Sequence, residues 1–305
     1  MLTEQQLVER KSGIGGSDIG AILGLNKWTS PLDVYLDKTG QADGPDLSDN
    51  EAVHFGNVLE DTIAQEYARR TGCKVRRRNQ RFTHPDHEWM AANIDRSVDG
   101  ERMILECKNS SQWMAGSWGE SGTDEVPESY LVQVAWYMAI LGYDRANLAA
   151  LIGGNNLRIY EFDRDLELES LLIDRSREFW FHNVLAGVAP APSCKRDLDT
   201  LYAMDNGEAM LADQTTEARV RELSDLRAKI KEWEKQADTL KFDIQAAMGS
   251  SATLLLGEDG SPLATWKSPK PGRRLQGKRL KEERPDIWER YAPVAENSRR
   301  FLVKI

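Results

Sequence analysis

Three residues of the stretch AANIDRSVDGERMILECKNS have types and a spacing that could perform metal-assisted chemistry: Asp95, Glu106 and Lys108, called the trio below. Two carboxylates can bind Mg²⁺ through their oxygens while positions remain for water and for a phosphate oxygen. The bound metal lowers the pKa of its water and neutralises charge that develops on the phosphate. A neighbouring ammonium group can orient the attacking water or stabilise the transition state. The trio is therefore a candidate site for phosphodiester hydrolysis.

The turn between the two carboxylates decides whether they can meet. Asp99-Gly100 is a strong signal for a tight two-residue turn between two strand-like runs. With residue 98 paired to residue 101, the trio projects from one face, because opposed residues and residues two apart on a strand share a face. The alternative interpretation is a surface strand with a cross-strand salt bridge, which is worth about 0–1 kcal/mol.

Several neighbouring residues have types that could take the same roles. Leu105 and Cys107 alternate with the trio and are expected on a core face. Asp99 is a rival to the first carboxylate, and we assign it to the turn. His84 and His87, in HPDH, have the look of a zinc pair, but in a turn-like stretch we interpret them as incidental.

The opening stretch SGIGGSDIGAILG raises a different candidate. It contains the Gly-x-x-x-x-Gly of a phosphate-binding loop, but Ala21 and Ile22 stand where that motif requires Lys and Ser or Thr. The stretch instead predicts a loop followed by a short helix, with Ser17 as its N-cap and Asp18 in its first turn.

Local signals predict the elements that must position these residues. Ser30 and Pro31 begin a helix that ends at Gly40, in the pattern of a cap, a first-turn proline and a terminal glycine. Further helices are expected over 50–71, 127–142 and 166–185, and strands over 74–83, 88–98, 102–110, 147–154 and 157–163.

The break GVAPAPS divides the chain into two predicted domains, 1–193 and 194–305. The second contains a heptad helix over 215–249, a hairpin over 252–267 and a basic tail over 268–305 that closes with a helix and a strand, RRFLVKI. The heptad stripe consists of Leu223, Leu226, Ile230, Trp233, Ala237, Leu240, Ile244 and Ala247. Its spacing fits either a coiled coil or a long helix lying on its own domain.

Composition places the chain among soluble globular proteins. It has 305 residues, of which 40% are hydrophobic and 29% charged. No apolar run approaches the ~20 residues that span a bilayer, and MLTEQQLVERKSG has no signal core, so we expect a cytoplasmic protein without a membrane partner. Cys73, Cys107 and Cys194 lie too far apart for a zinc finger or an iron–sulfur cluster.

Positive charge is concentrated in two segments of the chain, although the net charge is −9. The segment 266–305 contains 12 Lys+Arg against 5 Asp+Glu, and KVRRRNQR (residues 74–81) is a second basic run. Each run could be a solvated face or a surface that meets phosphates. Trp28 and Trp113 could contact DNA, although core packing is the expectation for at least one of them.

Four stretches in order resemble one family. NID and ECK resemble the PD-(D/E)XK nucleases. RKSGIGGSDIGAILG, FGNVLEDTIAQEYARRTG, NIDRSVDG with ILECK, and ESYLVQVAWYM together resemble the YqaJ-type viral recombinases, the family that includes phage lambda exonuclease. The resemblance spans residues 8 to 190 and implies an α+β (α/β/α) fold, with a central mixed sheet flanked by helices and a C-terminal helical and small β appendage.

The resemblance implies a role for each matching residue. Asp95 and Glu106 would bind the metal together with the Cys107 backbone carbonyl, and Lys108 would be the catalytic lysine. Glu60 would be a helix-borne acid that supports the metal or its water; without the resemblance it reads as an exposed helix residue. Asn93 and Ile94 depart from the family's pattern, which has a proline before the aspartate.

Four more residues receive roles from the resemblance. Gln133 would lie near the metal-bound water or the DNA, with Tyr137 beside it, one turn along the same helix. Arg10 and Ser17 match positions that hold the 5′-phosphate of a DNA end. An arginine fork, a hydroxyl and helix N-terminal amides make a sensible anion site.

The implied activity is a Mg²⁺-dependent exonuclease, with Mn²⁺ as a substitute, that degrades the 5′-ended strand of duplex DNA. The 3′ tails would pass to a single-strand annealing protein of the RecT or Red-beta type, in a bacterial host, from a phage or prophage gene. A homo-oligomer is expected, with a trimeric ring as one form. The alternatives are a Cas4- or RecB-like nuclease of other polarity, and a catalytically silent module that binds DNA or an annealing protein.

Overall fold

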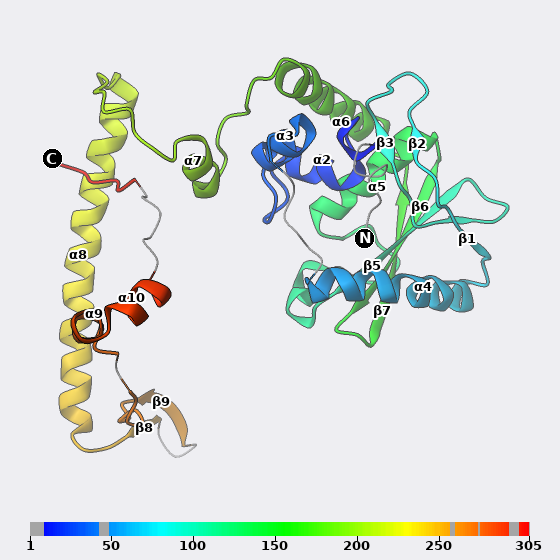
Figure 1. The fold of residues 1–305 in the computed structure, drawn as a ribbon. Helices are drawn as coiled ribbons and strands as arrows, with labels where there is room; N and C mark the ends of the chain where they lie inside the picture. The colour runs from blue at the N-terminus through cyan, green and yellow to red at the C-terminus, as the bar shows by residue number, and fades with distance from the viewer. Residues whose placement is uncertain (1–8, 43–48, 257–259, 274, 293–298, 305) are drawn as a thin grey trace. The chain divides into compact units, whose positions relative to one another are not determined.

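A mixed five-stranded sheet lies at the centre of the first half of the chain (Figure 1). Its strand order is β1-β4-β5-β6-β7, with β5 and β6 parallel and the other neighbours antiparallel. The strands are β1 (Val75–Arg77), β4 (Arg96–Val98), β5 (Met103–Ser110), β6 (Arg145–Ile152) and β7 (Asn156–Asp163); β2 (Phe82–Thr83) and β3 (Ala91–Ala92) form a separate pair. The predicted α+β architecture with a central mixed sheet is confirmed.

This computed structural model describes residues 9–42, 49–256, 260–273, 275–292 and 299–304. The chain forms two compact units, Met1–Leu201 and Tyr202–Ile305. No helix in these described ranges is both long enough and apolar enough to cross a membrane.

Helices cover both faces of the sheet. On one face, α4 (Glu51–Thr71) packs its buried Ile63 and Tyr67 against Leu105 and Cys107. On the other, α2 (Gly16–Ile22) and α5 (Glu128–Leu141) pack against residues such as Ile104. Figure 1 shows α4 on the opposite side of the sheet from α2, α3 and α5. Because both faces are covered, the first five residues of β5, Met103 to Cys107, are all buried instead of alternating between buried and exposed.

The remaining helices of the first unit follow the sequence signals closely. α3 (Pro31–Thr39) begins after Ser30, whose side chain accepts a hydrogen bond from the Asp33 amide, and ends at Gly40 in the left-handed conformation. α4 and α5 also end at left-handed glycines, Gly72 and Gly142. The predicted helix over 166–185 divides into α6 (Leu166–Glu178) and a π-helical segment, Phe179–Leu185. A short 3₁₀ segment, Gln112–Ser117, follows β5.

The hairpin that carries the trio has a longer turn than predicted. Arg96 pairs with Leu105 and Ser97 with Ile104, so the register differs by two residues from the expected one. β4 ends at Val98 and β5 begins at Met103, which leaves a four-residue connection in place of a two-residue turn. A shift of two keeps every side chain on its predicted face.

The first helix begins two residues earlier than predicted. Gly15, not Ser17, is the N-cap of α2, and its backbone N–H donates to Asp18 Oδ2 at 2.8 Å. Ser17 therefore lies in the first turn, one residue before the acid that caps the helix. The expectation that Trp28 or Trp113 packs in the core is also wrong, since their side chains are 84% and 96% exposed.

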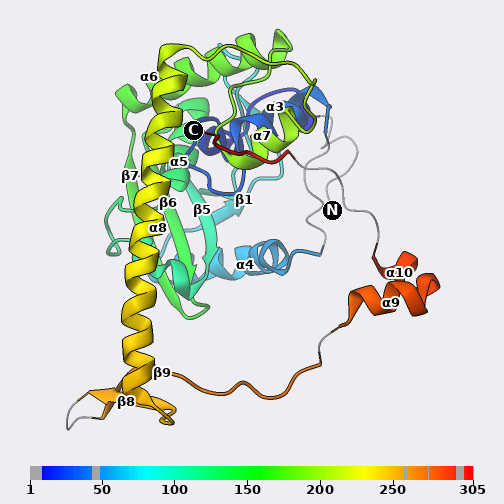
Figure 2. The same cartoon turned by 90° about the vertical axis from the view of Figure 1, so that its left-hand side faces the viewer.

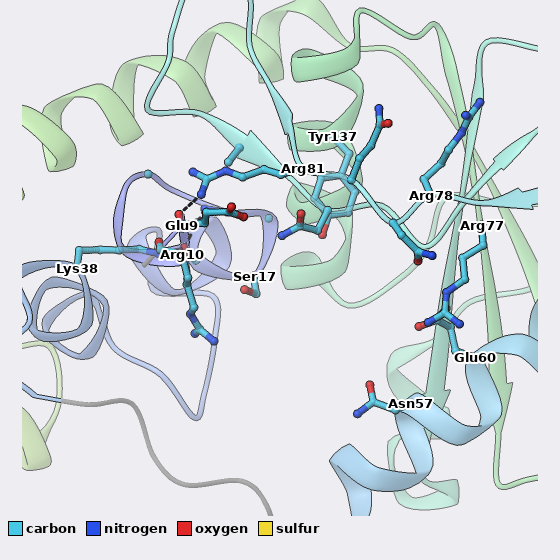
Figure 3. Close-up of a pocket in the computed structure, with 18 residues that line it drawn as sticks. Glu9, Arg10, Ser17, Lys38, Asn57, Glu60, Arg77, Arg78, Arg81 and Tyr137 are labelled. Carbon is cyan, nitrogen blue, oxygen red and sulfur yellow. Dashed lines mark hydrogen bonds and ion pairs between the residues drawn. The ribbon is translucent and has the colours of Figure 1, made fainter. Parts of the chain in front are cut away.

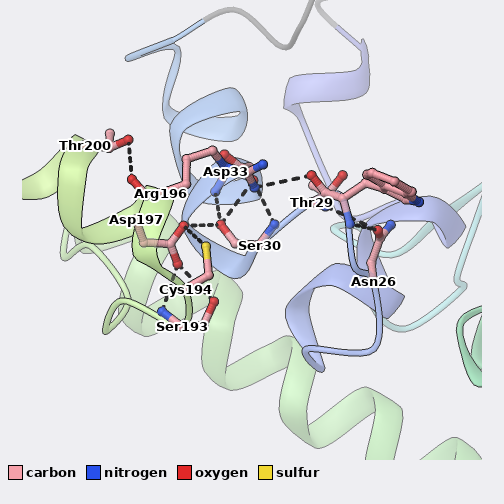
Figure 4. A network of polar contacts seen from close by, with 10 residues as sticks. Asn26, Thr29, Ser30, Asp33, Ser193, Cys194, Arg196, Asp197 and Thr200 are labelled. Atoms are coloured by element: carbon pink, nitrogen blue, oxygen red, sulfur yellow. Dashed lines mark hydrogen bonds and ion pairs between the residues drawn. The ribbon is translucent and has the colours of Figure 1, made fainter. Parts of the chain in front are cut away.

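The first unit extends beyond the boundary predicted after residue 193. It includes α7 (Lys195–Leu201), whose buried Asp197 accepts hydrogen bonds from the Ser30 hydroxyl at 2.7 Å and from the Ser193 amide at 2.8 Å (Figure 4). Burial alone would raise the pKa of Asp197, but these bonds outweigh it and lower the pKa to about 2. Arg196 adds an ion pair to Asp33 at 2.5 Å.

The second unit consists of one long helix and small elements. They are α8 (Gln214–Met248), the antiparallel pair β8 (Thr253–Leu256) and β9 (Ser261–Thr265), α9 (Gly277–Glu283) and α10 (Pro285–Tyr291); Figure 2 shows α8 along its full length. The turn expected at 257–260 lies mostly outside the described residues. The strand expected over the last residues is absent from 299–304.

Glycines let α2 approach α5 closely. A Cβ on Gly16 would lie 2.3 Å from Tyr137 Cε1 and 2.7 Å from its hydroxyl, and a Cβ on Gly20 would lie 3.3 Å from Ser129 Cβ. A Cβ on Gly13 would lie 2.6 Å from the Trp89 carbonyl oxygen. The glycines of the opening stretch therefore serve close packing instead of a nucleotide-binding loop.

Gly16→Ala is expected to lower the free energy of unfolding by about 1–3 kcal/mol, because its methyl group overlaps the Tyr137 ring. Gly56→Ala in α4 is the matched control. Nothing lies within 4 Å of its Cβ position, so it should be neutral or stabilising by up to about 1 kcal/mol. Urea unfolding of both variants measures the difference, and equal effects would contradict the packing argument.

Candidate active site

The residues of the trio come together just beyond the point where the backbone pairing between β4 and β5 ends. Asp95 immediately precedes β4, and the backbone pairing of the two strands ends at the pair Arg96 and Leu105. Beyond that point the Cys107 backbone N–H donates to Asp95 Oδ2 at 2.9 Å, so a side-chain carboxylate continues the ladder in place of the backbone. This bond fixes the first carboxylate against β5.

The second carboxylate, that of Glu106, is buried. One of its oxygens accepts hydrogen bonds, and the other has no partner among the described residues. Glu106 is 2% exposed, and its Oε1 accepts from Lys108 Nζ at 2.6 Å and from Gln133 Nε2 at 3.0 Å. The same Gln133 nitrogen donates to the Tyr137 hydroxyl at 2.9 Å. Glu106 Oε2 is buried and has no hydrogen-bond partner among the described residues. Buried polar atoms are nearly always paired, so this oxygen needs a ligand.

Burial and mutual repulsion shift the titration of the cluster. Burial, followed by the charge of Glu106, raises the pKa of Asp95 to about 8. Burial would lower the pKa of Lys108, but the charges of Glu106 and Asp95 outweigh it and raise that pKa. Burial and the Glu106 charge also raise the pKa of Tyr137 well above its usual value. Such shifts are typical of functional sites.

The donor set fits a hard divalent cation. The candidates are the orphaned Glu106 oxygen, the Asp95 carboxylate and the Cys107 carbonyl, which are oxygen ligands of the kind that Mg²⁺ prefers. In an extended strand the N–H and C=O of one residue point to the same side, so the Cys107 carbonyl is directed toward Asp95 as its amide is. A positive ion there would also relieve the repulsion that raises the pKa of Asp95.

Glu60 is not brought into this group as a third carboxylate. Within the described ranges, no three His, Cys, Asp or Glu side chains form a potential metal cluster. Glu60 Oε1 instead pairs with Arg96 at 2.5 Å and lies 3.9 Å from Arg77. His84 and His87 stack on each other with ring centroids 4.8 Å apart.

Arg96 is a buried neighbour of Asp95 to which the sequence patterns assign no role. Its side chain is 3% exposed, and it bonds Glu60, Asp61 at 3.2 Å and the Asp95 carbonyl oxygen at 2.8 Å. It thereby ties α4 to the residue that carries the first carboxylate. The signal was an arginine directly after Asp95 in a strand that is otherwise apolar or small, which requires acidic partners from elsewhere.

A cavity of about 640 Å³ is rich in cationic side chains (Figure 3); Asp95, Glu106 and Lys108 are not among its lining residues, but Tyr137, which Gln133 connects to Glu106, is. Its lining includes Arg10, Ser17, Lys38, Asn57, Glu60, Arg77, Arg78, Arg81, Asn93 and Tyr137. Figure 3 shows Arg10 and Ser17 near one another, Glu60 with Arg77 across the cavity, and Tyr137 between the two groups. Tyr137 belongs to both places, because its hydroxyl also accepts the bond from Gln133.

A buried ion pair holds the Arg10 side of this cavity. Lys38 Nζ lies 2.6 Å from Asp18 Oδ2 and donates to the Arg10 carbonyl oxygen at 2.8 Å. Both side chains are almost fully buried, at 1% and 7% exposure. The Arg10 guanidinium is half-exposed and lies 3.4 Å from Asp37.

The basic run 74–81 contributes three arginines to the cavity, Arg77, Arg78 and Arg81. Arg78 Nε donates to the Ser97 hydroxyl at 2.9 Å, and Arg81 donates to the Glu9 carbonyl oxygen. This run therefore forms part of a concave cationic surface instead of a uniformly solvated face.

The chain has a fold similar to that of an alkaline exonuclease of known structure. It is similar to a crystal structure of an alkaline exonuclease, LHK-Exo, from Laribacter hongkongensis, with a TM-score of 0.50 and 17% identity over 61% of this chain and 94% of that one. A structure of LHK-Exo in complex with dAMP also matches with a TM-score of 0.50, over 66% of this chain and 98% of that one.

The sequence comparisons identify the family. Residues 7–144 match the YqaJ-like viral recombinase domain. The chain is also 38% identical over 311 residues to the uncharacterized protein YqaJ of Bacillus subtilis (strain 168), and this match covers 100% of the chain and 95% of that protein. The chain belongs to the YqaJ-like viral recombinase family.

The raised pKa of Asp95 gives the metal-free protein a defined pH dependence. Between about pH 4 and pH 8 the folded state keeps a proton that the unfolded state has lost. The free energy of unfolding should therefore fall as pH rises through this range. Thermal unfolding in EDTA measures this slope, which Asp95→Asn should remove and Asp99→Asn, in the turn, should keep. An unchanged slope in Asp95→Asn would contradict the assignment.

Loss of the Arg96 guanidinium should destabilise the first unit. Arg96→Met leaves Glu60 and the Asp95 carbonyl without their buried donor, and we expect a loss of about 2–4 kcal/mol. The control is Arg76→Met on the neighbouring strand, whose ion pair with Asp99 is exposed and worth at most about 1 kcal/mol. Denaturant unfolding compares the two, and equal losses would refute a special role for Arg96.

Proposed function

We propose that this chain is a Mg²⁺-dependent exonuclease that degrades the 5′-ended strand of linear duplex DNA and leaves 3′ single-stranded tails. The observation that carries the proposal is the orphaned Glu106 oxygen beside Asp95, within a cluster that shares Tyr137 with a cationic cavity. Membership of a viral recombinase family and the fold of an alkaline exonuclease support the same activity.

Asp95, Glu106 and the Cys107 carbonyl would hold the metal, which would supply Lewis-acid activation of water and neutralise charge on the scissile phosphate. Mn²⁺, with similar ligand preferences, is expected to substitute.

Lys108 would be the catalytic donor. Its ammonium bonds Glu106 at 2.6 Å and lies 5.1 Å from the centroid of the Tyr130 ring, which holds it beside the carboxylates. Its raised pKa keeps it protonated at neutral pH. From there it can stabilise negative charge on the phosphate oxygens or orient the attacking water. Gln133 positions Glu106 and the Tyr137 hydroxyl through one amide nitrogen.

The cavity would hold the 5′-phosphate of the DNA end. Arg10 and Ser17 offer a half-exposed guanidinium and a hydroxyl on the same cavity wall, and Lys38 with Asp18 fixes the Arg10 backbone. Guanidinium groups bind phosphates strongly through paired N–H donors. A fixed phosphate site next to the hydrolytic cluster favours cleavage from an end over cleavage within a strand.

The family also guides the proposal for partners. The 3′-tailed product would pass to a single-strand annealing protein of the RecT or Red-beta type, in the cytoplasm of a bacterial host that carries the phage or prophage gene. Self-assembly, with a ring around DNA as one form, would serve processive digestion.

The test uses linear duplex DNA labelled at one end, with and without a 5′-phosphate, in Mg²⁺, Mn²⁺ or EDTA. We expect metal-dependent release of mononucleotides that is faster with the 5′-phosphate. Lys108→Ala and Asp95→Asn should lower kcat by about 10²- to 10⁴-fold, while binding of DNA persists.

Arg10→Gln tests the phosphate site separately. It should remove the preference for phosphorylated ends, mainly through a higher KM, and Arg76→Gln, outside the cavity, should keep it. Degradation that ignores the phosphate in the parent protein would refute the pocket but not the metal site. No degradation in either metal would refute the nuclease and favour a silent DNA-binding module.

A further inference from the structure

The helix α8 exposes the apolar stripe that its heptad spacing defines. Trp233 and Leu240 are 63% and 64% exposed, and Leu226, Ile230 and Ile244 are exposed as well. The stripe extends from Leu223 to Ala247, about 36 Å at 1.5 Å per residue. Contiguous apolar surface of this length on a soluble protein indicates an interaction site.

The residues along the stripe favour a two-stranded partner helix. With Leu223 at heptad position a, the β-branched Ile230 and Ile244 fall at position a, and Leu226 and Leu240 fall at position d. Isoleucine at a with leucine at d favours parallel dimers over larger bundles. Trp233 at d is followed by the small Ala237 at a, which leaves room for the indole ring.

The charges beside the stripe favour a second copy of the same helix in parallel orientation. In a parallel pair, position g contacts position e of the next heptad on the other helix. Glu222 (g) then faces Arg227 (e), and Lys229 (g) faces Glu234 (e), each twice by symmetry. Both pairs are attractive.

The antiparallel alternative is disfavoured by the same residues. An antiparallel pair with the stripes aligned over their full length brings Arg227 opposite Lys241, and Glu234 opposite its own copy. Both contacts are repulsive. The same alignment brings Lys229 opposite Asp243, which is attractive, but it cannot offset both repulsive contacts, whereas the two pairs of the parallel form are both attractive, so charge favours the parallel orientation.

We infer that α8 associates with α8 of a second copy of this chain as a parallel two-stranded coiled coil. The parallel orientation places the amino-terminal ends of both α8 helices together. Each first unit is connected to that end of its own α8, so both nuclease units are attached to the same end of the coiled coil. This inference does not depend on the proposed catalytic activity.

Sedimentation equilibrium of the full-length protein tests the assembly. The parent should have twice the chain mass at micromolar concentration. Leu240→Lys, at position d, should raise the dimer dissociation constant by about 100-fold or more, because two ammonium groups would be buried at the interface. Phe242→Lys is the matched control: Phe242 is an equally exposed apolar residue, but at position f on the opposite face. It should leave the mass unchanged.

Circular dichroism shows whether each variant keeps its helix, so a monomer that has simply unfolded is recognised. A monomeric parent protein, or a dimer that Leu240→Lys leaves intact, would overturn the inference. A trimer that Leu240→Lys dissociates would overturn the two-stranded form.

Charge reversal tests the orientation. Glu234→Lys should weaken the dimer about 3- to 10-fold, because two like-charged contacts with Lys229 replace two attractive ones. Adding Lys229→Glu should restore the parent affinity, since the pairs are again opposite in charge. In an antiparallel dimer the second substitution would instead face Asp243 and weaken the dimer further. Failure of the rescue would therefore refute the parallel arrangement.

Discussion

A glutamate in the middle of a core strand is the constraint on which the first unit depends. Glu106 follows Leu105 in β5, between two covered faces of the sheet, where an unpaired carboxylate is costly. Lys108 and Gln133 satisfy one of its oxygens, and the other is left for a ligand. The position of α5 follows from this need, because Gln133 must reach Glu106 while Tyr137 meets α2 at Gly16.

A buried ion pair between Lys38 and Asp18 holds the wall of the cavity to which Arg10 belongs. The Asp18 carboxylate caps α2 through the Gly15 amide and pairs with Lys38, which also bonds the Arg10 carbonyl oxygen. Removing either partner would leave a buried charge alone, which costs more than the pair contributes. The Lys38 ammonium group thus holds the opening glycine stretch in place. The missing side chain at Gly16 lets this stretch pack closely against Tyr137.

The sequence predicted the elements better than the contacts between them. Caps such as Ser30 and Asn50 and terminal glycines such as Gly142 are local signals, and they mark the observed helix ends. The trio was found because side chains on a strand alternate, and that alternation tolerates the two-residue error in the hairpin register. Arg96 and Lys38 were missed because their acidic partners lie on other elements, 36 and 20 residues away for Glu60 and Asp18. No local pattern reports such pairings.

The short helix α3 joins two sites that otherwise share no residue. Its N-cap Ser30 is bonded to Asp197 of α7, and Lys38 in its last turn is bonded to Asp18 and Arg10. A helix of nine residues is a stiff rod about 13 Å long. These bonds at its two ends make α3 a continuous hydrogen-bonded connection between α7, near which the chain leaves the first unit, and the Arg10 wall of the cationic cavity.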